Sequence, residues 1–272
     1  MSHVAEHSAI PDIYSWHQIG AWEREPDTTI PDFNTLRDRY GLPERPIDIN
    51  EYAWPDKQNP ANTAWYIAQL ERHNLRGLRA NWGGGGNLHD FMANLVFRDG
   101  DTYHPTGEWY LYRYYAQMTG DRVTTTASGD RLFDVFATTS GNVAKLVAGT
   151  RTVLAPYEIK VTGLTALGLP KKGSINIRTF SFDWAGIQAD TGGAVNLGIT
   201  KHAYSDGTVS RVGTRPPSCW IDELTGPSRI AVVCCEPFFQ QYCLRLRALR
   251  TGRMSRYTCM IQQRTVIPEA GL

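Results

Sequence analysis

Cysteine is absent from the first 218 residues of this 272-residue chain, and lysine is absent after Lys201. No apolar run is long enough to form a membrane helix, and residues 1–12 lack the apolar core of a signal peptide. The net charge is only +1, too little to create a field that would attract nucleic acid or an anionic membrane. We therefore expect no secretion signal, no nucleic-acid partner and no membrane partner.

The overall composition is typical of a folded protein, since 42% of the residues are hydrophobic. The last part of the chain differs, because from Arg211 onward it holds all five cysteines and nine arginines against four acidic residues. Three interpretations of this segment are possible. Disulfides would leave one of the five cysteines unpaired, and a zinc site would require a Cys-x-x-Cys spacing that is missing. A basic helix that binds an acidic partner would need an apolar stripe, and the segment has no clear one. We expect residues 211–272 to be an aberrant tail, read through or out of frame, that is disordered or poorly packed.

The most informative stretch in the first part of the chain is residues 46–55. Residues 47–50 alternate between apolar and polar, which predicts a strand, and Pro46 and Pro55 lie on either side of it. Glu51 follows at the carboxyl end, and a side-chain period of two places it on the same face as Ile47 and Ile49. Catalytic carboxylates are presented in this way in parallel barrels. An acidic residue that merely ends the strand or caps the next helix is an equal alternative.

Strands and helices alternate around this stretch. We expect strands at residues 13–17 and 75–82, and helices at 33–39, 60–73 and 105–118. This order predicts parallel strands with crossover helices in residues 1–121. Short strands with turn signals between them follow, so we expect residues 122–210 to form a small antiparallel β-sandwich.

Three of the predicted strand ends carry polar or aromatic side chains: His17, Glu51 and Trp82. A glycosidase needs a carboxylate that stabilises or attacks an oxocarbenium-like centre, a neighbour that orients it, and an aromatic face for the sugar ring. The three strand ends supply these three residue types.

The sequence also resembles a known family, the clan A retaining glycoside hydrolases related to family 39, in which a (β/α)8 barrel is followed by a β-sandwich. The resemblance extends from about residue 12 to residue 210. It is carried by Ile49-Asn50-Glu51-Tyr52, Tyr14-Ser15-Trp16-His17, Ala80-Asn81-Trp82-Gly83 and the aromatic helix 105–118. It implies that the chain contains the last three strand–helix units of the barrel, followed by the sandwich.

The same resemblance implies roles for individual residues. Glu51 matches the nucleophile, His17 a residue that orients it, and Trp82 an aromatic platform. Asn50, Tyr52 and Trp54, which flank Glu51, are assigned with Trp82 to substrate binding. The resemblance further implies a carbohydrate substrate and an extracellular location.

One part of the family pattern is missing. The strands that would precede His17 are absent, and with them the Asn-Glu pair that provides the acid/base; Glu23, Glu25 and Glu44 lie in loops or a turn and do not replace it. Because a retaining mechanism needs two carboxyl groups, we expect an apparently truncated glycosidase with little or no activity alone. The alternatives are a non-catalytic carbohydrate-binding or scaffold protein and an inaccurate gene model.

We expect neither a metal nor a cofactor. Four metal-binding residue types occur in the first part of the chain, but they lack the short spacings of a metal site and are better interpreted as loop residues: His73, His89, Asp90 and His104.

Overall fold

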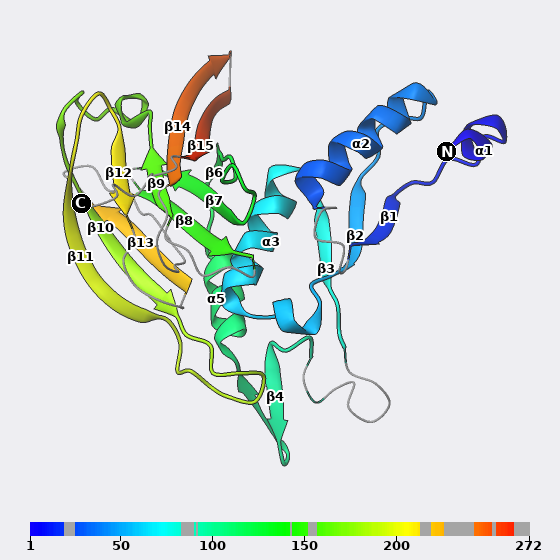
Figure 1. Ribbon diagram of the computed structural model, residues 1–272, viewed down its shortest axis with the longest axis horizontal. Coiled ribbons are helices and arrows are strands. Elements are labelled where there is room, and N and C mark those ends of the chain that lie inside the picture. The colour runs from blue at the N-terminus through cyan, green and yellow to red at the C-terminus, as the bar shows by residue number, and fades with distance from the viewer. Residues whose placement is uncertain are drawn as a thin grey trace, which may run out of the picture.

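Figure 1 shows the computed structural model of the chain. The structure describes residues 1–18, 25–82, 90, 92–141, 143–151, 157–212, 219–225, 242–251 and 254–263. Beyond residue 210 it describes the course and pairing of strands.

A three-stranded parallel sheet forms the first part of the molecule. Its strands are β1 (Tyr14–Gln18), β2 (Ile47–Tyr52) and β3 (Arg76–Arg79), in that order, so β2 is central. The crossovers carry α2 (Pro26–Arg39) and α3 (Pro60–Arg72). The predicted order of three parallel strands with crossover helices is confirmed for this part of the chain.

The start of α2 differs from the prediction. The helix begins at Pro26 instead of at residue 33, after Glu25 in an extended N-cap conformation, and Pro31 lies inside it. Proline at the first helical position lacks only an N–H that would be unpaired there, so Pro26 can begin the helix at little cost. The short helix α1 (Ser2–Glu6) precedes the sheet.

Helix α3 is the element that joins the two halves of the molecule, and Figure 1 shows it between the two sheets. The Asn59 side chain caps it by accepting a hydrogen bond of 3.1 Å from the N–H of Asn62. Its buried residues divide between two cores: Ala64, Ile67 and Ala68 pack with the large sheet, and Trp65, Tyr66 and Leu70 with the parallel sheet. A helix buried on both sides is expected to fix the two sheets relative to each other.

Close contact between α3 and the large sheet depends on glycine. At Gly149, in β8 (Val143–Thr150), a Cβ atom would lie 2.0 Å from the carbonyl oxygen of Ala61 and 2.7 Å from the Cβ of Ala64. Only a residue without a side chain allows the helix to lie this near the strand.

The hairpin β4 (Val96–Asp99) and β5 (Thr102–Pro105) leads into α5 (Gly107–Tyr115), and the sequence did not predict this hairpin. The helix itself is shorter than the predicted 105–118. Its Leu111 is fully buried against the core of the large sheet.

The large sheet has eight strands in the order β11-β10-β13-β8-β7-β6-β15-β14, and a separate ribbon pairs β12 with β9. The pairings are antiparallel except for that of β15 with β6. The elements not yet given are η1 (Pro55–Lys57), β6 (Asp121–Thr124), β7 (Phe133–Ser140), β9 (Glu158–Val161), η3 (Leu164–Leu167), β10 (Gly173–Phe182), β11 (Val195–Tyr204), β12 (Val209–Val212), β13 (Cys219–Thr225), β14 (Tyr242–Thr251) and β15 (Met254–Gln263).

Within residues 122–210, the expected short strands with a turn between them are confirmed for β7 and β8, which pair as an antiparallel hairpin. The structure gives strands in the segment 211–272, where the sequence predicts a disordered or poorly packed tail. The origin of the parallel strands as the last three units of a (β/α)8 barrel, the β-sandwich and the division of the chain at residues 121 and 210 remain predictions.

Candidate active site

Glu51 is an extra residue in the central strand. In the pairing of β2 with β3, Asn50 lies opposite Leu78 and Tyr52 opposite Arg79, so two consecutive residues of β3 face a stretch of three in β2. The register shifts at the same place against β1. Glu51 therefore occupies a β-bulge, a feature that often redirects a side chain next to an active site.

The backbone at the bulge is strained. Glu51 has a φ of +120° and Ala53 a φ of +68°, values in the left-handed region that side-chain-bearing residues rarely adopt. Each such residue costs about 1–3 kcal/mol and persists only where the surroundings hold it. Strain of this kind is concentrated at functional sites, which makes the carboxyl end of β2 a candidate site on geometry alone.

The bulge corrects the predicted face of Glu51. Ile49 and Tyr52, three residues apart, both lie in the core beneath the sheet, with exposures of 1% and 4%. Glu51 instead points to the side of His17, whose Nδ1 atom lies 3.3 Å from Glu51 Oε2. The period of two fails here because the extra residue moves the following side chains to the opposite face.

The pair of His17 and Glu51 is accessible, with side-chain exposures of 53% and 39%. It lies on the face of the parallel sheet opposite to the buried Ile49 and Tyr52, which we call the open face. The paired residues Ser15, Asp48 and Arg76 share this face, and Leu78 on the edge strand is 60% exposed. Asp48 is held there by Arg76, whose Nη2 donates to Asp48 Oδ2 over 2.8 Å.

Two tryptophans form an aromatic surface just beyond the bulge. The rings of Trp54 and Trp82 stack with centroids 4.7 Å apart and an angle of 13° between their planes. Trp82 Nε1 donates a hydrogen bond of 2.8 Å to the carbonyl oxygen of Ala53, which ties the pair to the strained backbone. Both rings are more than one third exposed, so the stack can offer a ring face to a ligand.

The remaining residues assigned to substrate binding lie in different surroundings. Asn50 is exposed on the open face. The Tyr52 hydroxyl is bonded to the hydroxyl of Tyr112 in the core, and burial raises the pKa of Tyr52 well above 10. This placement assigns Tyr52 to the support of the bulge rather than to contact with a ligand.

A buried ion pair that the sequence analysis did not identify lies beneath the site. Arg79 of β3 and Glu108 of α5 are paired, and the Thr63 hydroxyl donates to the same carboxylate. Burial raises the pKa of Glu108 to about 7, although the charges and hydrogen bonds of Arg79 and Thr63 oppose the shift. Because Arg79 also lies opposite Tyr52 in the sheet, this network can fix the carboxyl ends of β2 and β3 against α5.

The other carboxylates named in the sequence analysis do not complete a pair with Glu51. Glu25 is buried in an ion pair with Arg151. Glu44 lines a cavity at the opposite end of β2, beside Pro46. Glu23 lies outside the described residues.

Among the described residues, no cluster of three or more His, Cys, Asp or Glu side chains could hold a metal ion. His73 is bonded to Asp27 Oδ1 over 2.6 Å, and His104 stacks on Phe97 with ring centroids 5.3 Å apart. His89 lies outside the described residues. Nor does the part of the chain that the structure describes include a helix long and apolar enough to cross a membrane.

Comparison with known proteins found similarity to parts of larger proteins, and no protein-family model matches the chain. A stretch of 123 residues is 23% identical to the 3-O-α-D-galactosyl-α-L-arabinofuranosidase of Bifidobacterium longum subsp. longum, and it covers 44% of this chain and 10% of that protein.

Among solved structures, N2152 from Neocallimastix frontalis is similar with a TM-score of 0.66 and 22% identity over 82% of this chain and 55% of that one. An arabinose-bound GH51 α-L-arabinofuranosidase is similar with a TM-score of 0.43 and 13% identity over 75% of this chain and 37% of that one. The chain thus spans about half the length of N2152 and shares its fold over that length.

Proposed function

We propose that the chain is the carboxyl-terminal part of a retaining glycoside hydrolase related to family 39 of clan A, and that Glu51 is its nucleophile. The observation that carries the proposal is the bulge at the carboxyl end of β2, which turns Glu51 out of the core and towards His17. The stacked Trp54 and Trp82 then supply the aromatic surface on which sugar rings pack. The similarity to the Bifidobacterium 3-O-α-D-galactosyl-α-L-arabinofuranosidase favours a glycoside as the substrate class.

In this proposal the carboxylate attacks the anomeric carbon and forms a covalent glycosyl-enzyme intermediate. His17 is within hydrogen-bonding range of Glu51 Oε2 and orients it for attack. A second carboxyl group, about 5–5.5 Å from the first, would protonate the leaving oxygen. Asp48, which shares the open face, is held by Arg76, so we assign the acid/base to barrel strands that this sequence does not contain.

Attack by Glu51 and protonation of the leaving group are two separate chemical roles. A substrate with an activated leaving group tests the first of them alone. A dinitrophenyl glycoside needs no protonation of its leaving group, so Glu51 can displace it without an acid. We expect the chain to release about one equivalent of dinitrophenolate in a burst and then to turn over very slowly, because no base activates water. A panel beginning with the α-L-arabinofuranoside supplies the sugar, and stopped-flow absorbance measures the burst.

Two variants make the test specific. Glu51→Gln is expected to abolish the burst, and Asp48→Asn, on the same open face, to retain it. A burst that survives in Glu51→Gln, or is absent with every sugar of the panel, counts against the nucleophile assignment.

A non-catalytic carbohydrate-binding role is the second candidate, favoured by the exposed Trp54–Trp82 stack and by the pairing of Glu51 with a histidine instead of a second carboxyl group. It predicts saturable binding of an oligosaccharide that Trp82→Ala weakens, with no burst from any activated glycoside.

A further inference from the structure

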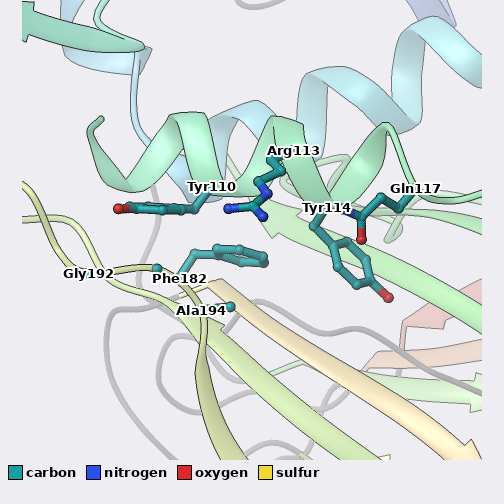
Figure 2. Close-up of a pocket in the computed structure, with 8 residues that line it drawn as sticks. Tyr110, Arg113, Tyr114, Gln117, Phe182, Gly192 and Ala194 are labelled. Carbon is teal, nitrogen blue, oxygen red and sulfur yellow. The ribbon is translucent and has the colours of Figure 1, made fainter. Parts of the chain in front are cut away.

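A second cavity, of about 280 Å³, lies between α5 and the large sheet (Figure 2). Its walls come from Tyr110, Arg113, Tyr114 and Gln117 on the side of α5, from Phe182 at the end of β10, and from the loop 192–194 that leads into β11. The volume is close to the lower limit of about 300 Å³ for ligand pockets and is enough for about one sugar ring.

This cavity is distinct from the site at Glu51. Tyr110, Arg113 and Tyr114 follow the i, i+3, i+4 spacing of one helix face. Tyr112, which bonds to Tyr52 beneath the bulge, lies on the opposite face of the same helix. A ligand in the cavity therefore has no direct access to Glu51.

Arg113 is the charged side chain of the cavity wall. Figure 2 shows it between Tyr110 and Tyr114 and next to the Phe182 ring. Its guanidinium carbon lies 5.4 Å from the centre of the Trp109 ring, so a cation–π contact holds it in place. No carboxylate of the described residues is paired with it, and the walls of the cavity contain no acidic residue.

One further cation and one acid lie beside the cavity, so Arg113 remains the charged group of the wall itself. Lys145 Nζ donates to the backbone oxygen of Gln117 over 3.2 Å and lies 5.8 Å from the centre of the Tyr114 ring. Asp190, the nearby acid, is engaged through Oδ1, which accepts hydrogen bonds from the Tyr110 hydroxyl over 3.0 Å and from the Gly192 N–H over 2.7 Å.

The glycine loop keeps the cavity open. Gly192 and Gly193 have φ values of +75° and +100°, which other residues adopt only with strain. A Cβ atom on Gly193 would lie 3.6 Å from the Tyr110 ring and would occupy the space beside it.

We propose that this cavity binds a single sugar unit that carries a carboxylate, a uronic acid, with the carboxylate on Arg113 and the ring against Tyr110 and Phe182. A guanidinium pairs with a carboxylate through two parallel hydrogen bonds, and aromatic rings pack against the apolar face of a sugar. The site goes beyond the proposed hydrolase function, since it involves neither Glu51 nor turnover.

Isothermal titration calorimetry on the full chain at low ionic strength tests the proposal, with D-glucuronate and D-galacturonate as probes. We expect at least one of them to bind, and D-glucose and acetate to bind at least about tenfold more weakly. Arg113→Gln is expected to weaken uronate binding by a similar factor. The control Arg39→Gln, which removes another exposed arginine stacked on an aromatic ring, is expected to change nothing.

Three results would overturn the proposal: no uronate binding, equal binding of acetate or glucose, or an Arg113→Gln variant that binds as the parent chain does. Because Arg113 is exposed, its substitution is expected to leave the thermal unfolding midpoint unchanged. Glu51→Gln separates the two sites: it is expected to abolish the burst with activated glycosides and to leave uronate affinity intact.

Discussion

His17 Nδ1 lies 3.3 Å from Glu51 Oε2, and the two side chains meet because β2 contains one residue more than its neighbours at this point. The contact orients a carboxylate that is otherwise 39% exposed and free to rotate. The bulge, rather than the length of the strand, therefore defines the candidate active site.

Removal of the histidine is expected to slow attack by Glu51 without abolishing it. An exposed ion pair contributes about 0.2–1 kcal/mol, and both side chains of this pair are more than one third exposed. Because 1.4 kcal/mol corresponds to about tenfold in rate, we expect His17→Ala to reduce the burst rate by up to about fivefold in stopped-flow absorbance. Ser15→Ala, which alters the same exposed face two residues earlier, serves as the control, and equal rates in both variants would contradict an orienting role.

The strain at Glu51 predicts a gain in stability on substitution by glycine. Glycine adopts a φ of +120° without steric cost, so Glu51→Gly is expected to raise the free energy of unfolding by about 1 kcal/mol. Asn50→Gly, at the adjacent strand position without a positive φ, is expected to lower it by about 0.5–1 kcal/mol. Urea denaturation measures both, and a Glu51→Gly variant as destabilised as Asn50→Gly would argue against strain at the bulge.

The buried pair of Arg79 and Glu108 is expected to be essential for folding of the site. Glu108→Ala leaves Arg79, whose side chain is 6% exposed, without its carboxylate, a change that costs about 3–5 kcal/mol. Asp48→Ala breaks the comparable pair with Arg76 on the exposed face and is expected to cost less than about 1 kcal/mol. Similar losses in the two variants, measured by chemical denaturation, would mean that the buried pair has no special role.

Stability is expected to fall in acid partly through Asp27. Burial opposes ionisation of this carboxyl, but hydrogen bonds from His73 and Arg72 outweigh burial and hold the pKa of Asp27 well below its usual range. Because the folded pKa lies below the unfolded value of 3.8, the contribution is present above about pH 4 and is lost as the pH falls further.

Asp27→Asn is therefore expected to flatten the dependence of unfolding free energy on pH between pH 5 and 3 by about 1 kcal/mol or more. The control Asp101→Asn alters a fully exposed carboxyl and is expected to keep the slope of the parent chain. If the free energy of unfolding of Asp27→Asn depends on pH as steeply as that of the parent chain, Asp27 does not contribute to the loss of stability in acid.

The sequence predicted the parallel strands well because alternation and flanking prolines are local signals. It did not predict the bulge, since the period of two seen in residues 47–50 was extended to Glu51, although Asn50 and Glu51 are consecutive polar residues. The available signal was the spacing of Ile49 and Tyr52, two apolar residues three positions apart in a strand.

Other features of the site depend on contacts that are distant in sequence. Arg79 and Glu108 are 29 residues apart, and the stacked tryptophans 28, so neither pair could be inferred from local patterns. The ion pair depends on the contact of α5 with β3, and the tryptophan stack on the pairing of β2 with β3, beyond whose ends the two rings lie.

The most direct test of the central claim is to identify the residue that an activated 2-deoxy-2-fluoro dinitrophenyl glycoside labels. The fluorine slows breakdown of the glycosyl-enzyme intermediate, so intact-mass and peptide mass spectrometry can locate it. We expect one adduct per chain, on Glu51, and none on the Glu51→Gln variant. A label on another residue, or no label with any sugar of a panel that includes the α-L-arabinofuranoside, would contradict the assignment of Glu51 as the nucleophile.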